Sequence, residues 1–217
     1  MPKWVKTIVA VLLLPLCFGA VQALLRVLGD TGRAELIWVA LLAGAACWLV
    51  VFLLLPKPML LYVFGHELTH ALWTWVFGGR VKKFKVTGKG GHVVITKTNF
   101  IIVLAPYFFP LYVVAVVLVF VLGHLLFGWM KYAVWFHLLI GAAYAFHVTL
   151  TWHALQTRQT DITSQGCFFS AVIIFLGNIS VLLLGVPLLT GSVRWLTAMG
   201  WWLEESGAVL HRLRALF

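Results

Sequence analysis

The sequence predicts an all-α polytopic membrane protein with about six transmembrane helices, a membrane-associated β-hairpin and a C-terminal interfacial amphipathic helix. Hydrophobic residues make up 63% of the 217 residues and charged residues only 10%, whereas roughly 25% is typical of soluble domains. The mean hydropathy is +1.03. A soluble fold of this size cannot bury so much apolar surface, so lipid must surround much of the chain. We therefore expect a multi-pass protein of a bacterial-type cell membrane.

Six apolar runs are long enough to cross a bilayer, which takes about 20 helical residues. They lie near residues 5–28, 36–55, 58–77, 101–127, 132–155 and 167–190. Pro106 and Pro110 should kink or break the fourth run, because proline removes a backbone donor and its ring clashes with the preceding helical turn.

The end of the chain has a different pattern. From Trp195 to Phe217, apolar residues recur at helical spacing opposite Arg and Glu side chains, which is typical of a helix that lies in the membrane interface. We expect one integral membrane domain over residues 1–217. Within it, two accessory helices occupy 5–57, the core occupies 58–190, and 191–217 form the amphipathic tail.

A β-hairpin is predicted between the third and fourth runs. Residues 81–86 and 92–96 are rich in strand formers, and they flank a Gly-Lys-Gly-Gly turn. The hairpin can offer a strand edge to a partner, with Val93, Val94 and Ile95 as candidate substrate contacts. The alternative is a basic surface loop that anchors to lipid headgroups.

Charge argues for contact with the bilayer rather than with nucleic acid. Lys and Arg outnumber Asp and Glu by 16 to 6, for a net charge of +10. These cations lie at the ends of apolar runs, where they suit anionic headgroups. The larger share of them lies on the side of the hairpin, which predicts that the hairpin and the active site are nearer the cytoplasm.

The third run contains Gly65-His66-Glu67-Leu68-Thr69-His70. Side chains four residues apart share one face of a helix, so His66 and His70 can bind one metal ion. Glu67 lies beside them and can accept a proton from a water that zinc activates. An ionisable triplet midway along an apolar span is costly to bury, which favours a functional role. The pattern predicts a zinc site with Glu67 as the general base.

A catalytic zinc takes three protein ligands and keeps one position open. Asp161 lies in an unusually long polar segment before the last apolar run. From the residues alone, His147 and His153 compete with Asp161 for the role of third ligand.

The stretch HELTHALWTWVFGGRVKKFKV resembles the site-2 protease family of intramembrane zinc metalloproteases. The resemblance covers mainly residues 58–190. It implies one zinc per chain, Asp161 as the third ligand and a membrane protein as the substrate. The family's Asp is usually followed by Gly, whereas this chain has Asp161-Ile162.

The expected function is that of an intramembrane zinc endopeptidase that cleaves transmembrane segments of membrane proteins. Asn178, in the last apolar run, is a further candidate substrate contact, or else it makes a bond between helices. Two other functions stay open. The chain can be a non-proteolytic zinc-binding protein or chaperone that keeps the protease fold, or a small transporter.

Overall fold

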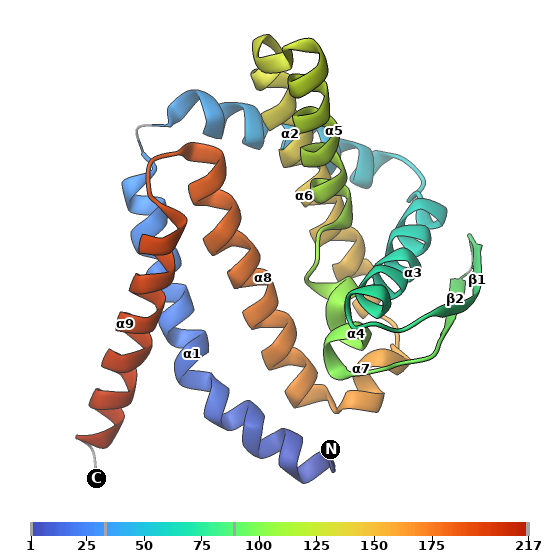
Figure 1. Cartoon of the computed structure of the whole chain (residues 1–217), viewed down its shortest axis with the longest axis vertical. Coiled ribbons are helices and arrows are strands. Elements are labelled where there is room, and N and C mark those ends of the chain that lie inside the picture. The colour runs from blue at the N-terminus through green and yellow to red at the C-terminus, as the bar shows by residue number, and fades with distance from the viewer. Residues whose placement is uncertain (1, 33, 89, 216–217) are drawn as a thin grey trace. The chain divides into compact units, whose positions relative to one another are not determined.

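The computed structural model describes residues 2–32, 34–88 and 90–215. The described chain is mainly helical, with one antiparallel hairpin (Figure 1). It separates into two compact units. Residues 1–35 and 160–217 form the first unit, and residues 36–159 form the second. Each is described below by itself.

The described residues of the first unit form three long helices and one short helix. The long ones are α1 (Lys3–Asp30), α8 (Cys167–Thr190) and α9 (Trp195–Arg214), and the short one is α7 (Thr160–Gln165). Helix α1 packs against both α8 and α9 (Figure 1).

Helix α9 forms where the amphipathic pattern predicts a helix, and it packs along α1. Gly19 permits the close approach, because a Cβ there would lie 2.5 Å from the backbone nitrogen of Ser206. The Arg26 guanidinium donates to Glu204 and Glu205 at 3.1 and 2.9 Å. The polar face of α9 is thus partly engaged within the protein. Its position in the membrane interface stays a prediction.

The second unit contains the hairpin and the remaining helices. Its longer helices are α2 (Glu35–Leu54, which begins on the last residue of the first unit), α3 (Met59–Val76), α5 (Leu111–Phe127) and α6 (Ala133–Leu155). Its shorter elements are β1 (Val81–Thr87), β2 (Gly90–Ile95), α4 (Phe100–Leu104), η1 (Ala105–Tyr107) and η2 (Trp129–Tyr132).

Helices α2 and α6 meet through glycines. A Cβ on Gly44 would lie 1.8 Å from the Leu138 carbonyl oxygen, and a Cβ on Gly141 would lie 1.9 Å from that of Leu41. The absence of side chains lets the two backbones touch, which is a common device between membrane helices. The contact fixes α2 on α6.

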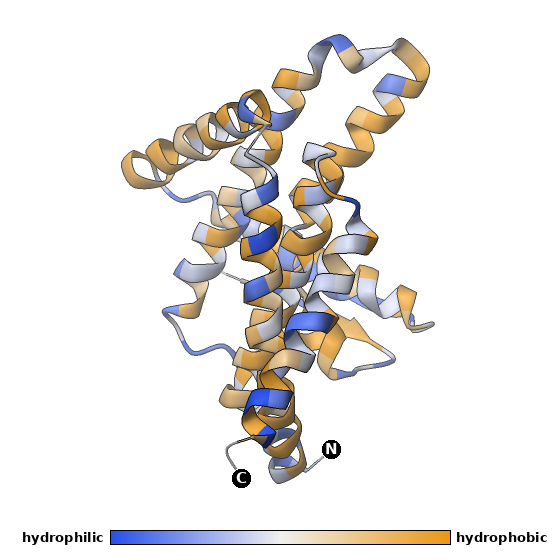
Figure 2. Cartoon of the chain, turned by 90° about the vertical axis from the view of Figure 1, so that its left-hand side faces the viewer, coloured by the Kyte–Doolittle hydropathy of each residue, from blue (hydrophilic) through white to orange (hydrophobic). Residues whose placement is uncertain are grey.

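Among the described residues, four helical segments are long and apolar enough to cross a membrane: α1, α2, η2 with α6, and α8. The count rises to five if α4–η1 and α5 form one broken span, whose halves meet at 79°. This bend confirms the effect predicted for Pro106 and Pro110. Hydrophobic residues cover most of the length of the long helices (Figure 2).

The structure does not confirm six spans, and the difference lies in α3. The helix forms within the predicted run 58–77, but it does not pass the same test of length and hydropathy. The physical reason is its polar triplet, because His66, Glu67 and His70 lower the mean hydropathy of an 18-residue helix.

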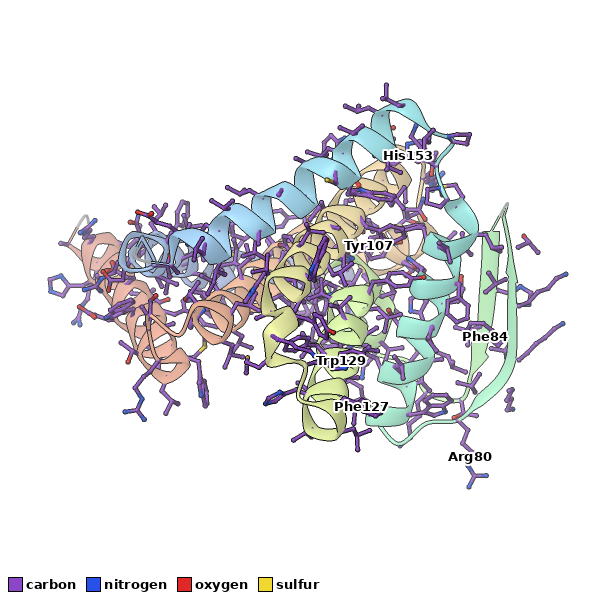
Figure 3. The ribbon with its side chains drawn as sticks, turned by 90° about the horizontal axis from the view of Figure 1, so that it is seen from above. Arg80, Phe84, Tyr107, Phe127, Trp129 and His153 are labelled. Atoms are coloured by element: carbon purple, nitrogen blue, oxygen red, sulfur yellow. The ribbon has the colours of Figure 1, made fainter. Side chains whose placement is uncertain are left out.

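The predicted hairpin is present. Strands β1 and β2 pair antiparallel, with Val81 opposite Ile95 and Val86 opposite Gly91, and the register shifts between Val81 and Lys83. Both strands pack against α3. Phe84 points from β1 toward α3, where its ring meets that of Phe64, and Arg80 points outward (Figure 3).

Candidate metal centre

Helix α3 places both histidines of the H-E-x-x-H motif on one face. The His66 and His70 ring centroids are 4.9 Å apart, as expected for side chains separated by one helical turn. Glu67 and His70 are both only 8% exposed. Two imidazoles and a carboxylate are therefore held together inside the second unit.

A backbone contact fixes the protonation of His70. Its Nδ1 lies 2.8 Å from the carbonyl oxygen of Ile102. A carbonyl oxygen can only accept, so Nδ1 must carry the hydrogen, and the lone pair is on Nε2. A hydrogen bond of this kind orients the histidine ligands of metal sites and raises their basicity.

The same contact depends on the start of α4. Asn99 caps this helix, because its side-chain oxygen accepts from the Ile102 backbone N–H at 2.8 Å. The cap holds the first turn of α4 in place. Asn99 therefore fixes the residue whose carbonyl orients His70.

His66 is surrounded by aromatic rings. Tyr107 of η1 is 1% exposed, and its ring meets that of His66 edge-on at 5.2 Å. The ring of Tyr62, one turn earlier in α3, lies 5.9 Å away. The segment that contains Pro106 thus brings an aromatic side chain against a candidate metal ligand.

One cluster of metal-ligating side chains stands out in the described part of the chain: His66, His70 and Asp161. Each offers one ligand atom, and these atoms all lie within 4.8 Å of one another. Asp161 is the second residue of α7, whereas His147 and His153 are not part of the cluster. Two imidazole nitrogens and one carboxylate oxygen are ligands that suit zinc. These three residues can hold a metal ion.

Strand β2 crosses α3 directly at Glu67. A Cβ on Gly91 would lie 2.7 Å from Glu67 Cγ, 2.9 Å from Val63 Cγ1 and 2.9 Å from the Lys85 carbonyl oxygen. Real Cβ atoms essentially never come so close, so the crossing requires glycine at this position. The sequence predicts the hairpin but not the contact between Gly91 and Glu67, because its pattern identifies Gly91 only as a turn residue.

A small cavity of about 20 Å³ lies beside His66. His147 of α6 also lines it, together with Tyr62, Gly65, Thr69, Pro106, Phe109, Leu111, Tyr112 and Phe146. His147 is 8% exposed, so its imidazole is buried in the wall of the cavity that His66 also lines. From the sequence alone, His147 is a competitor of Asp161 for the role of third metal ligand, because the spacing of residues does not show that α6 lies beside His66.

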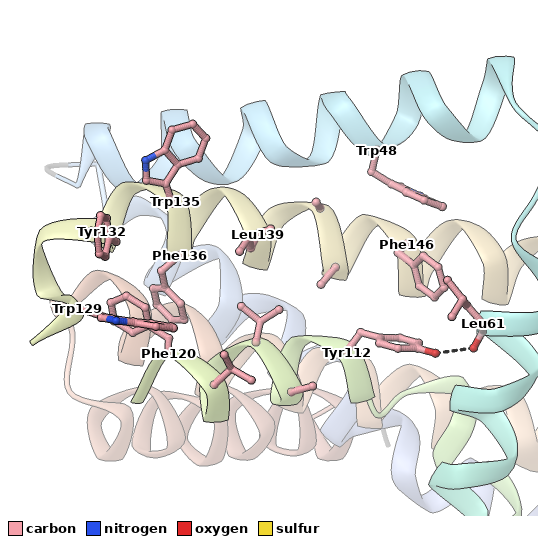
Figure 4. A pocket seen from close by; sticks show the side chains of 15 residues that line it. Trp48, Leu61, Tyr112, Phe120, Trp129, Tyr132, Trp135, Phe136, Leu139 and Phe146 are labelled. Atoms are coloured by element: carbon pink, nitrogen blue, oxygen red, sulfur yellow. Dashed lines mark hydrogen bonds between the residues drawn. The ribbon is translucent and has the colours of Figure 1, made fainter. Parts of the chain in front are cut away.

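A second, larger cavity of about 930 Å³ lies between α2, α5 and α6 (Figure 4). Its walls are apolar and aromatic, and they include Trp48, Val119, Phe120, Trp135, Phe136 and Leu139. Tyr112 and Phe146 line both cavities, with ring centroids 5.0 Å apart. The Tyr112 hydroxyl donates to the Leu61 carbonyl oxygen at 2.5 Å. These two rings therefore belong to the walls of both cavities.

The remaining predicted residues lie on two elements. Val93, Val94 and Ile95 are on β2, opposite Phe84, Lys83 and Val81 of β1. Asn178 lies in α8, where its amide donates to the Ile174 carbonyl oxygen at 2.9 Å. The substrate contacts of these residues stay predictions.

No protein-family model, curated protein or solved structure matches the chain. The candidate chemistry therefore follows from the residues of α3, α4, α6, α7 and β2 alone.

Proposed function

We propose that the protein is an intramembrane zinc metalloendopeptidase, similar to the site-2 proteases, which hydrolyses peptide bonds in membrane-spanning segments of other proteins. One observation carries the proposal: buried Glu67 lies on α3 beside His66 and His70, whose ligand atoms cluster with that of Asp161. A centre that only bound a metal would need its ligands but not a neighbouring acid.

His66, His70 and Asp161 would hold the zinc, with Nε2 of His70 as that residue's ligand atom because Nδ1 bonds Ile102. Three protein ligands leave a fourth position open, as catalytic zinc sites require. The metal would supply a Lewis acid that polarises the carbonyl and lowers the pKa of water.

Glu67 would move the protons. Its carboxylate accepts a proton from the attacking water as the new C–O bond forms at the carbonyl carbon. It then returns a proton to the amide nitrogen as the C–N bond breaks. Glu67 is buried, and its side chain lies against Gly91 of β2, so its carboxylate is positioned away from bulk water.

The apolar cavity supports a membrane-embedded substrate. Its 930 Å³ is bounded by α5 and α6, both parts of candidate spans, and its lining suits aliphatic side chains. A transmembrane helix hides its carbonyls in its own hydrogen bonds, so the substrate must unwind before hydrolysis. Strand β2 is well placed to pair with the unwound stretch, because it passes directly over Glu67.

The test compares wild type with Glu67→Gln. Both proteins are purified in mild detergent, loaded with zinc and incubated with a panel of single-span model substrates. Glutamine keeps the shape of the side chain but cannot accept a proton. We expect about one zinc per chain in both proteins and a cleavage rate at least ~100-fold lower in the variant. Equal cleavage by both proteins, or wild type without zinc, would refute the proposal.

A further inference from the structure

We propose that His147 is a second catalytic residue of this centre, which donates a hydrogen bond from Nε2 to the carbonyl oxygen of the scissile peptide bond. The inference rests on the proposed peptidase function and deepens it. It assigns a residue that recognises the oxygen of a substrate amide, a role that neither the metal ligands nor Glu67 fills.

The first observation is a buried nitrogen. Nε2 of His147 has almost no contact with solvent and no hydrogen-bond partner among the residues that the structure describes. A polar atom left unpaired inside a protein is destabilising. Polar side chains that persist within membrane helices usually have a function. We therefore expect Nε2 of His147 to form a hydrogen bond with a molecule outside the described chain.

The second observation is the cavity that His147 shares with His66. Its volume of about 20 Å³ exceeds the ~10–15 Å³ that one water molecule needs. A single oxygen atom fits there, either that of a water or that of a carbonyl. The cavity can thus hold one oxygen atom between His147 of α6 and His66 of α3, a candidate metal ligand.

Two hydroxyl groups in the cavity lining cannot donate to the substrate carbonyl oxygen, because they already donate elsewhere. The Thr69 hydroxyl already donates to the Gly65 carbonyl oxygen at 2.7 Å, and the Tyr112 hydroxyl donates to Leu61. Each hydroxyl has only one hydrogen to give. His147 can offer the hydrogen of its Nε2 tautomer, and Tyr62 is the one further side chain of the lining that has a hydroxyl.

The chemistry explains why a donor belongs there. When water adds to a peptide carbonyl, negative charge develops on the carbonyl oxygen. An N–H group placed in advance stabilises that charge in a site without bulk water, and losing one such donor typically slows catalysis ~100- to 1,000-fold. A neutral imidazole with its hydrogen on Nε2 suffices.

The test uses full-length, zinc-loaded protein and acetohydroxamate, a small chelator whose oxygens bind zinc and accept hydrogen bonds. For His147→Ala we expect unchanged zinc content, at least ~10-fold weaker acetohydroxamate binding and kcat/KM at least ~100-fold lower. His147→Gln, which keeps an N–H donor, should recover part of both losses. His153→Ala, on the same helix but outside the cavity and the metal cluster, should match wild type.

The outcomes separate this inference from the proposed function. If wild type binds neither zinc nor acetohydroxamate, both the peptidase proposal and the donor role of His147 are refuted. If wild type binds both and His147→Ala binds acetohydroxamate equally well, only the inference is overturned. Loss of zinc in His147→Ala would also overturn it, since the residue would then support the metal rather than the substrate. A loss seen in Tyr62→Phe but not in His147→Ala would assign the donor role to Tyr62.

Discussion

The carbonyl oxygen of Ile102 accepts a hydrogen bond from Nδ1 of His70 at 2.8 Å. Ile102 lies in the short helix α4, just before the bend at Pro106, and its own N–H is capped by Asn99. The broken fourth run thus contains the carbonyl that orients a candidate metal ligand. In an unbroken helix the Ile102 carbonyl would accept from the backbone N–H of residue 106, and proline at that position has no N–H to give.

Replacement of Asn99 should therefore weaken metal binding without removing any ligand. In Asn99→Ala the cap is lost, which typically costs about 1 kcal/mol of helix stability, and the Ile102 carbonyl becomes less well placed. We expect zinc affinity to fall about fivefold, as measured by competition with a chelator of known affinity. Asn99→Ser keeps a side-chain acceptor and should stay near wild type. Equal affinities in all three proteins would contradict this coupling.

Asp161 should be the third ligand, and His153 should not. An amide is a far poorer zinc ligand than a carboxylate, so Asp161→Asn should lose at least ~10-fold in zinc affinity together with most of its cleavage activity. His153→Ala should retain both. Elemental analysis after dialysis measures the bound zinc. Full zinc occupancy and activity in Asp161→Asn would remove Asp161 from the centre.

Gly91→Ala should reduce cleavage while zinc stays bound. The added methyl group would lie 2.7 Å from Glu67 Cγ, so either the carboxylate or the strand must move, and a misplaced general base loses much of its effect. We expect at least a ~10-fold lower rate. Gly88→Ala, where an added Cβ meets nothing within 4 Å, is the matched control. Wild-type rates in Gly91→Ala would show that the contact does not matter for catalysis.

Proline in β2 tests capture of the substrate by strand pairing. Val94→Pro removes a backbone donor and fixes φ, so it should severely reduce cleavage of a membrane substrate while zinc content stays near wild type. Val94→Thr keeps both the donor and β-branching, and it should have a much milder effect. If the proline variant cleaves at the wild-type rate, the hairpin is a headgroup anchor instead.

The contact between α2 and α6 should be sensitive to one methyl group. In Gly44→Ala the new Cβ would overlap the Leu138 carbonyl oxygen, so the helices must separate, at a cost of about 1–3 kcal/mol. Gly185→Ala adds the same group in α8 with nothing within 4 Å, and it should be neutral or slightly stabilising. Thermal unfolding in detergent compares the two, and equal Tm values would argue against close packing at Gly44.

Local patterns explain what could be predicted from the sequence. The spacing of His66 and His70 is a property of one helix, the turn between the strands is a property of four residues, and Pro106 breaks its own helix. From the residues alone, Asp161 could not be separated from His147 and His153, because spacing along the chain does not show which side chains meet in the fold. Only the resemblance to the site-2 proteases favours Asp161. The number of spans stays a prediction, because the polar triplet lowers the hydropathy of α3.

The cavities could not be predicted at all. The walls around His147 come from residues more than 80 positions apart in the chain, and no periodicity connects them. The packing of α9 on α1 depends on Gly19, which the sequence shows only as a small residue within an apolar run.

Gly91 meets Glu67 at one fixed rung of the β1–β2 ladder, opposite Val86. If a substrate strand pairs with β2, each of its residues advances about 3.3 Å along that ladder. The Glu67 carboxylate then lies at a fixed number of residues from any other position on the paired strand. Under the proposed function, the position of the cleaved bond would then be set by its distance along the strand from the point where the substrate helix unwinds. Substrates of unrelated sequence would be cut at a constant offset from that point, and shifting the unwinding point by two residues would move the cut by two.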